Sequence, residues 1–381
     1  MWLFDKRKLH NIEYVLLIIV GALCLFGLIA IIAALADASP SGEETTLLEK
    51  LSRLNFVTAR KHLIWIAIST VVMACIAMLD YHIYSKIWAF VLIVCLGLIV
   101  LTSFFGVVRG GTRGWIAITE DFYFQPTEVG KLALILILAK TISQKESLDK
   151  FRDLWTTIGA MGLFVAALLT QMDVGTSLVY VFIFAVMLFI GGMRWKHILI
   201  MVGVCIACCV AIWFILGEAQ QSRIINFLSG EDVGQLKYSK IAIGSGGFFG
   251  KGILGLDSIS QSGDIPAIHT DFIFSAIGES MGFIGGILLI GLYTAMEIRM
   301  WYLIQHKAHD RYGKMIIVGV MAMFMFHIFE NIGMVMGIMP ITGIPLPFVS
   351  YGGSSMLTNM IGIGLVESVC MNRPIEPFTS E

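Results

Sequence analysis

The run YVLLIIVGALCLFGLIAIIAAL, Tyr14 to Leu35, extends for 22 residues without a charge. A transmembrane helix needs about 20 predominantly apolar residues, so this run is long enough to cross a bilayer. Five further uncharged runs have a similar length: Leu63 to Leu79, Ile87 to Val107, Leu154 to Met172, Val174 to Met193 and Ile198 to Gly217. The sequence therefore predicts at least six membrane-spanning helices.

Four more apolar stretches contain ionisable groups: Gln125 to Ile142, Phe272 to Met296, Met315 to Met339 and Tyr351 to Met371. Charge inside a membrane is costly and usually faces a cavity or a partner, so we expect the chemistry in these stretches. Together the runs predict an all-α, polytopic membrane protein of about ten transmembrane helices. We treat residues 1–381 as a single domain.

The composition excludes several other classes. Of the 381 residues, 57% are hydrophobic and 14% are charged, whereas a soluble domain carries about 25% charged residues. The net charge is −1, and no basic stripe with interleaved aromatic residues suggests nucleic acid as a partner. All seven cysteines lie in apolar runs, which argues against a disulfide framework.

Ten helices with an intracellular N-terminus place the loops near residues 80–86, 143–153, 194–197 and 299–314 in the cytoplasm. Lys and Arg are more frequent in these loops and at the termini than in the opposite loops, as the positive-inside rule requires. Both termini are therefore predicted to be cytoplasmic. The single long outer loop spans residues 218–271, and a loop of that length in a compact protein is usually functional.

The motif QPTEVGK, residues 125–131, opens the fourth predicted helix on the outer side. Pro126 suits the first helical position, and Glu128 then falls where a carboxylate can satisfy free backbone N–H groups. Lys131 lies three residues later on the same helix face, so an ion pair with Glu128 is geometrically easy. The alternative is that both residues hold an anionic substrate.

The motif QMDVGT, residues 171–176, lies in a tight hairpin between two spans and places Asp173 at the outer surface. Aspartate is a favoured N-cap, so Asp173 can simply cap the sixth helix. It can also help to hold a sugar or a divalent cation, because Mg²⁺ is often bound by one or two carboxylates plus substrate phosphates.

The loop RGGTRGWI, residues 109–116, places Arg109, Arg113 and Trp115 just outside the third helix. Tryptophan at the interface is usually a membrane anchor. Arginine also recognises phosphate bidentately, and an indole face can stack on a sugar, so the cluster equally suits a sugar-diphosphate lipid.

The glycine-rich segment SKIAIGSGGFFGKGILG, residues 239–255, is expected to be an interfacial or re-entrant element. Its glycines would permit close backbone approach to a ligand. The string around Lys251 resembles a phosphate-binding loop but departs from the G-x-x-x-x-G-K-[ST] pattern, because Ser245 and Gly252 occupy two of the required positions.

The segment HTDFIFSAIGES, residues 269–280, begins the eighth helix. Thr270 can cap that helix, which would put Asp271 in its first turn, where the helix dipole stabilises the anion. The alternative is that Asp271 is a general base. Glu279 lies two turns deeper, and we expect it to be an internal hydrogen-bonding partner.

Proline and glycine also interrupt PITGIPLPFVSYGGSS, residues 340–355, which cannot be a regular helix throughout. Irregular backbone at membrane depth is tolerated when it is buried in protein or lines a wet cavity, so we expect a cavity wall. On the preceding helix, His327, Glu330 and Asn331 are spaced to share one polar face.

Six strings in order resemble the SEDS family of RodA and FtsW: GTRGWI, FQPTEVGKLALI, QMDVGTSLV, SKIAIGSGGFFGKG, HTDFIFSAIGE and ITGIPLPFVSYGGSSMLTNMIGIGL. The run ENIGMVMGIMPITGIPLPFVSYGGSS is more similar to the elongation branch than to the division branch, and the sporulation branch stays open. The resemblance implies a peptidoglycan glycosyltransferase of the bacterial cytoplasmic membrane that polymerises lipid II, an undecaprenyl-diphosphate-linked disaccharide pentapeptide, during cell elongation and shape maintenance.

The resemblance also implies residue roles. The family's catalytic aspartate falls on Asp271, and its substrate-site residues fall on Trp115, Glu128, Lys131, Asp173 and Lys251. A class B penicillin-binding protein and other membrane proteins of the elongation complex are the implied partners.

Glycosyl transfer with loss of a diphosphate needs a base for the attacking hydroxyl and positive charge on the leaving group. Asp271 suits the first role, and Arg109, Arg113, Lys251 or a divalent cation such as Mg²⁺ or Mn²⁺ suits the second. A lipid II flippase or another transporter is the main alternative, since intramembrane Glu, Lys and His also suit a translocation path. A non-catalytic scaffold for a penicillin-binding protein is the third.

Overall fold

A computed structural model of the protein describes residues 10–36, 56–109, 112–119, 122–145, 148, 154–171, 173–201, 203, 213–214, 218–230, 234–253 and 258–372. Most of these residues are helical. The longer helices are α2 (Tyr14–Ala34), α4 (Phe56–Met78), α6 (Trp88–Phe105), α7 (Pro126–Ser143), α8 (Trp155–Leu169), α9 (Val174–Ile190), α13 (Ile273–His306), α14 (Arg311–Val335) and α15 (Gly353–Met371). Shorter helices are α5 (His82–Lys86), α11 (Glu218–Ser229) and α12 (Gln235–Ser245).

The nine longer helices coincide with nine of the ten predicted spans. Within the described residues, α2, α4, α6, α13, α14 and α15 are long and apolar enough to cross a membrane, and α8 and α9 are shorter apolar helices. Helix α7 carries Glu128, Lys131 and Lys140 among its 18 residues. The tenth predicted span, residues 198–217, lies largely outside the described residues. The multi-pass helical fold is confirmed.

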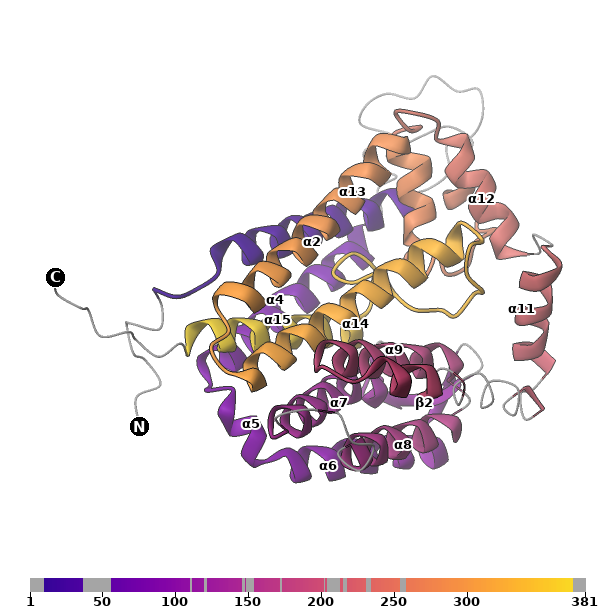
Figure 1. Ribbon diagram of the computed structural model, residues 1–381. Helices are drawn as coiled ribbons and strands as arrows, with labels where there is room; N and C mark the ends of the chain where they lie inside the picture. The colour runs from indigo at the N-terminus through magenta and orange to yellow at the C-terminus, as the bar shows by residue number, and fades with distance from the viewer. Residues whose placement is uncertain are drawn as a thin grey trace, which may run out of the picture.

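Helices α7 and α14 form the centre of the bundle (Figure 1). Helix α7 packs against α6, α8, α9, α14 and α15, and α14 also packs against α9 and α13. Most α7 side chains are buried, and Thr127, Glu128 and Lys131 are among them. The outer helices α4 and α6 instead expose most of their apolar side chains, as expected for helices that face lipid.

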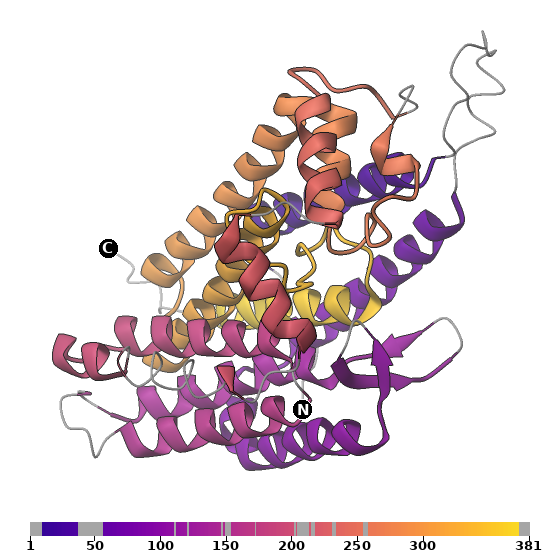
Figure 2. The same ribbon diagram turned by 90° about the vertical axis from the view of Figure 1, so that its right-hand side faces the viewer.

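Among the described residues, a small sheet departs from the predicted all-α fold. Strands β1 (Val107–Arg109), β2 (Thr112–Ala117) and β3 (Tyr123–Phe124) form an antiparallel sheet in the order β1-β2-β3. It lies at one side of the bundle (Figure 2). Ser354, at the start of α15, holds the sheet to the bundle by donating to Tyr123 O (3.0 Å) and accepting from Gln125 N (3.1 Å). The sequence did not indicate strands here, because short strands have no clear apolar alternation.

This sheet, the turns before α13 and the loop between α14 and α15 meet at one end of the bundle, here called the site end. Tyr351 N donates to His269 O across 2.9 Å and so connects two of the three segments. The predicted long loop 218–271 contains α11, α12 and the 3-10 turn η2 (Ile259–Gln261). Helix α12 packs on α13 and α14.

Helix α13 is broken near Gly282, where φ is 65° and ψ is −161°. The glycine-rich segment after α12 supplies the missing backbone partners. Lys251 N and Gly252 N donate to the carbonyls of Glu279 and Ser280 (both 2.9 Å). In return, Phe283 N donates to Gly247 O (3.0 Å). The two segments therefore satisfy each other's free backbone groups, as burial away from water requires.

Two glycines of this segment, Gly246 and Gly250, approach protein backbone, and a close approach of the segment to a ligand stays a prediction. A β-carbon at Gly246 would lie 1.9 Å from Gly278 O, and one at Gly250 would lie 2.3 Å from Ser280 O. Gly250 also has a φ of +81°, a conformation that L-residues rarely adopt. The segment is thus part of the scaffold that supports the start of α13.

We expect Gly250→Ala to lower the free energy of unfolding by about 1–3 kcal/mol, because the new methyl group meets a carbonyl oxygen in a left-handed conformation. Thermal unfolding of the detergent-solubilised protein measures the change. Gly244→Ala is the matched control, since a β-carbon there meets nothing within 4 Å. Equal melting temperatures for the two variants would contradict this account of the glycine-rich segment.

Candidate active site

Asp271 lies in a turn before α13 and not in the helix. Thr270 N and Phe272 N both donate to Ala267 O (3.2 and 3.1 Å), which closes the turn. Helix α13 then begins at Ile273, with Phe272 as its N-cap and no side-chain cap. The expectation that Thr270 caps the helix and that Asp271 occupies its first turn is therefore wrong. Helix capping therefore does not explain why an aspartate occupies position 271.

The Asp271 carboxylate faces the backbone of Gly343 in the loop between α14 and α15. A β-carbon at Gly343 would lie 3.3 Å from Asp271 Oδ2, and Gly343 has a φ of +75°. Glycine allows both the backbone conformation and the close approach of the carboxylate. Gly343 is exposed and Asp271 is half-buried, so this carboxylate sits at an accessible position.

The neighbouring loop residue, Thr342, connects this position to α9 and α14. Its hydroxyl donates to Glu330 Oε1 across 2.8 Å. A β-carbon at Gly175, in the first turn of α9, would lie 3.0 Å from Thr342 O. Residues 342 and 343 therefore separate Asp271 from the N-terminus of α9. Residues 340–352 form no helix or strand, as the prolines and glycines predicted, and a cavity lined by this loop stays a prediction.

Asp173 is the N-cap of α9, which confirms the capping interpretation. Its Oδ1 accepts from Thr176 N (2.9 Å), and its Oδ2 accepts from Thr176 Oγ1 (2.8 Å) and from Gln125 Nε2 (3.2 Å). Burial raises the pKa of the Asp173 carboxyl, and the Thr176 hydrogen bonds oppose that rise. The Gln125 contact, which the sequence did not reveal, joins the cap of α9 to the start of α7.

Lys131 is buried between two partners. Its Nζ lies 2.8 Å from Glu128 Oε1 and 2.9 Å from His327 Nε2. The Glu128–Lys131 pair is the one that the sequence spacing predicted. Lys131 is 1% exposed and Glu128 is 5% exposed, so the pair is desolvated and each charge depends on the other.

His327 adds a partner from α14 to this pair. An ammonium group has no lone pair, so the His327 ring must accept from Lys131 through Nε2 and is neutral in this contact. His327, Glu330 and Asn331 are all buried. The polar face predicted on α14 therefore exists, and it points into the bundle.

Arg109, Arg113 and Trp115 lie on the small sheet at the site end. The Arg109 guanidinium sits 4.2 Å from the ring centroid of Tyr123 and 5.9 Å from that of Trp115. Arg109 and Arg113 are exposed and Trp115 is half-buried. A β-carbon at Gly114, beside Trp115, would lie 2.7 Å from Gln171 Oε1, which places this strand against the hairpin that ends in Asp173.

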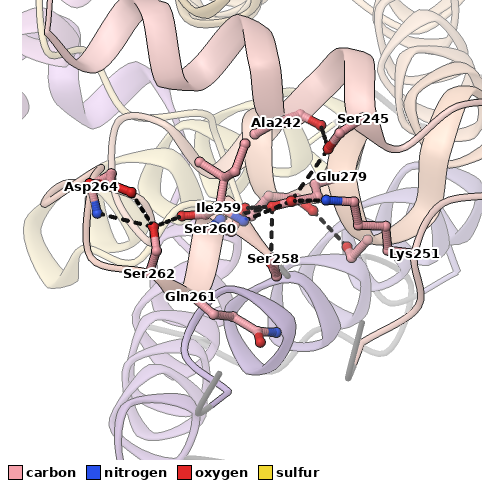
Figure 3. A network of polar contacts seen from close by, with 12 residues as sticks. Ala242, Ser245, Lys251, Ser258, Ile259, Ser260, Gln261, Ser262, Asp264 and Glu279 are labelled. Atoms are coloured by element: carbon pink, nitrogen blue, oxygen red, sulfur yellow. Dashed lines mark hydrogen bonds and ion pairs between the residues drawn. The ribbon is translucent and has the colours of Figure 1, made fainter. Parts of the chain in front are cut away.

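Lys251 is held by Glu279 (Figure 3). Its Nζ lies 2.9 Å from Glu279 Oε1, and Glu279 is 1% exposed. The same carboxylate accepts from Ser258 Oγ (3.0 Å), Ile259 N (2.8 Å), Ser260 N (2.8 Å) and Ser260 Oγ (2.6 Å). Glu279 is thus the internal partner that we expected, and it neutralises Lys251 while fixing η2 to α13.

No cluster of three or more His, Cys, Asp or Glu residues suited to a metal ion occurs in the part of the chain that the structure describes. Asp173 offers a single carboxylate that already accepts three hydrogen bonds from protein donors. Carboxylate oxygens retain further lone pairs, so Asp173 fits as one ligand of a cation whose remaining ligands come from a substrate.

Comparison with known proteins identifies the family. The model of the FtsW/RodA/SpoVE cell cycle protein family matches residues 14–374. The chain belongs to this family. Peptidoglycan glycosyltransferase MrdB of Escherichia coli K12 is 34% identical over 81% of this chain and 84% of its own length. Stage V sporulation protein E of Bacillus subtilis is 34% identical over 83% of this chain and 87% of its own.

Solved structures of the family have the same fold. One chain from a study of polymerization and crosslinking by a peptidoglycan synthase complex has a TM-score of 0.76 at 25% identity, covering 95% of this chain and 98% of its own. The rod shape determining protein RodA of Thermus thermophilus has a TM-score of 0.70 at 24% identity, covering 96% and 98%. The family's helical membrane fold is therefore the fold of this protein.

The buried pair in α7 gives a prediction with two parts. Either single change, Glu128→Lys or Lys131→Glu, leaves an uncompensated buried charge and should cost about 3–5 kcal/mol. We expect the charge-swapped double variant to recover only part of this loss. It restores the Glu–Lys pair, but an ionised carboxylate at position 131 has no proton to donate to His327 Nε2.

A double-mutant cycle on thermal unfolding measures the recovery. His327→Ala is the matched control, because it removes the second partner and leaves both charges in place. Complete recovery in the swapped variant would mean that the His327 contact contributes nothing.

Proposed function

We propose that this protein polymerises lipid II into glycan strands outside the cytoplasmic membrane during cell elongation and shape maintenance. The protein is a peptidoglycan glycosyltransferase and a multi-pass membrane protein, in agreement with its family and with relatives such as MrdB. The position of Asp271 carries the proposal: its carboxylate does not cap a helix and faces the exposed backbone of Gly343.

In the proposed reaction, Asp271 is the general base. The acceptor sugar's 4-hydroxyl loses its proton to the Asp271 carboxylate and attacks the anomeric carbon of the donor MurNAc. The bond between that carbon and the diphosphate breaks, and its electron pair leaves with undecaprenyl diphosphate. Attack from the opposite face inverts the α-linked donor into a β-1,4 glycan. General-base action of this kind contributes about 10²–10⁴-fold in rate.

The leaving diphosphate needs positive charge, and the site end offers Arg109 and Arg113 on the exposed part of the sheet. Trp115 can stack on a sugar beside them. Lys251 is a weaker candidate than the sequence suggested, because Glu279 already neutralises its ammonium group. The buried Glu128–Lys131–His327 group joins α7 to α14, and direct contact with substrate stays a prediction for these residues.

The orientation in the membrane is proposed from the distribution of Lys and Arg among the loops, and the partner is proposed from the family. Both termini are cytoplasmic in this proposal, which puts the site end outside, where lipid II is delivered. A class B penicillin-binding protein, with other membrane proteins of the elongation complex, is the proposed partner. The similarity to a chain of a peptidoglycan synthase complex supports this choice.

We expect Asp271→Asn to abolish polymerisation while leaving membrane insertion and thermal stability intact. The amide keeps the shape of the side chain but cannot take up the hydroxyl proton, so the rate should fall by about 10²–10⁴-fold. Purified protein, with and without its penicillin-binding partner, is incubated with lipid II in detergent, and glycan polymer is measured.

The matched control is Asp264→Asn, which changes an exposed aspartate of the same loop and should leave the rate unchanged. Polymer formation by Asp271→Asn at the native rate would move the base to another carboxylate. Lipid II transport by the wild-type protein without any polymer would favour the flippase.

We also propose that a divalent cation, Mg²⁺ or Mn²⁺, contributes to diphosphate departure, with Asp173 as one ligand. Such a cation would neutralise charge on the diphosphate. Chelator should then stop polymerisation, and added Mg²⁺ or Mn²⁺ should restore it. Asp173→Asn should raise the cation concentration needed for half-maximal rate, since Asn still caps α9 but carries no charge. Full activity in chelator would remove the cation from the proposal.

A further inference from the structure

Three consecutive backbone carbonyls, those of residues 269–271, are each held by a group from the α14–α15 region. His269 O accepts from Tyr351 N (2.9 Å), Thr270 O from Ser350 Oγ (2.6 Å) and Asp271 O from Asn331 Nδ2 (2.8 Å). The turn that carries the proposed base therefore has its main chain fixed at every residue. Two of the three donors are side chains, so they depend on residue type.

Asn331 connects two segments that are far apart in the sequence. Its Nδ2 donates to Asp271 O and also to Ile344 O across 2.7 Å. Asn331 is 0% exposed, and its Oδ1 has no hydrogen-bond partner among the described residues. The site thus uses the two N–H donors of the amide and not its acceptor. A carboxylate or an apolar side chain of the same size cannot replace it.

Ser350 also connects the Asp271 turn to the loop between α14 and α15. Its hydroxyl donates to Thr270 O and accepts from Leu346 N across 2.8 Å. The tight turn that presents it contains Phe348, a non-glycine residue with a φ of 65° that is 1% exposed. Such strained residues cost about 1–3 kcal/mol and persist where the surroundings over-determine them. Phe348 packs on Phe324 of α14, with the ring centroids 5.3 Å apart.

Helix α14 reaches both parts of the site from one face. Asn331 holds the Asp271 turn, and His327, four residues earlier, holds Lys131 of α7. Residues four apart lie one above the other on a helix. A single rigid element therefore fixes the main chain at Asp271 relative to the buried charge pair.

We propose that Asn331 and Ser350 are positioning residues, which set the Asp271 carboxylate in the geometry required for glycosyl transfer. The inference rests on the proposed function of Asp271. Neither residue is assigned a contact with lipid II. Loss of either donor frees a carbonyl of the turn and lets the carboxylate shift, and a displacement of about 1 Å can cost about 10²-fold in rate.

The test uses the full-length chain with its penicillin-binding partner and lipid II as the probe. Asn331→Leu and Ser350→Ala are compared with Ser239→Ala. Ser239 is a matched control, because it too is a buried serine whose hydroxyl donates to a backbone carbonyl, that of Val335, across 2.8 Å. For each variant we measure kcat, KM, the melting temperature and the stoichiometry of lipid II binding.

We expect Ser350→Ala and Asn331→Leu to lower kcat by about 10- to 100-fold, with KM and binding stoichiometry unchanged. Ser239→Ala should keep the wild-type kcat even if its melting temperature falls equally. If Asn331→Leu fails to fold, Ser350→Ala decides. A Ser350→Ala variant with the kcat of Ser239→Ala, or with losses that appear in KM or in binding stoichiometry, would overturn the proposal. Absence of polymer from the wild-type protein would instead refute the proposed function.

Discussion

Lipid cannot hydrogen-bond to a backbone amide or solvate an ammonium group, so a polar group inside this bundle is stabilised chiefly by partners in the protein. The site end depends on that constraint. Lys131 is buried because Glu128 and His327 both reach its ammonium. Helix α13 can break at Gly282 because the glycine-rich segment supplies backbone donors and acceptors to the broken turn. In each case a group from a distant part of the chain completes a local arrangement.

The same constraint explains why α14 is central to the proposed chemistry. The loop that follows it cannot form regular secondary structure, so its backbone groups need side-chain partners. Asn331 and Ser350 provide them and in the same contacts hold the turn that carries Asp271. These contacts thereby hold the irregular loop in place. Rigidity of this kind is what a positioned base requires, because its carboxylate must meet the attacking hydroxyl without further ordering.

Local sequence patterns predicted contacts between residues that are close in the sequence and missed contacts between residues that are far apart in it. The Glu128–Lys131 pair and the Asp173 cap are separated by three residues or fewer from their main partners, and helix periodicity was enough to find them. The Lys251–Glu279 pair was not predicted, because the two residues lie 28 positions apart in the sequence. The expected helix cap at Thr270 was wrong for a similar reason. The turn is closed by its own backbone and held by the loop between α14 and α15, so α13 begins later than the capping residue suggests.

By itself the sequence determined that this is a multi-pass helical membrane protein, where nine of its longer helices lie and which family it belongs to. These properties follow from apolar run length and from short ordered motifs, both of which are local. Only the tertiary structure decided that Asp271 stands outside α13 against Gly343, that Lys251 is neutralised and that Asn331 spans two segments. These contacts join residues that are 13 or more positions apart, and a helical period or a capping rule extends over a few residues only.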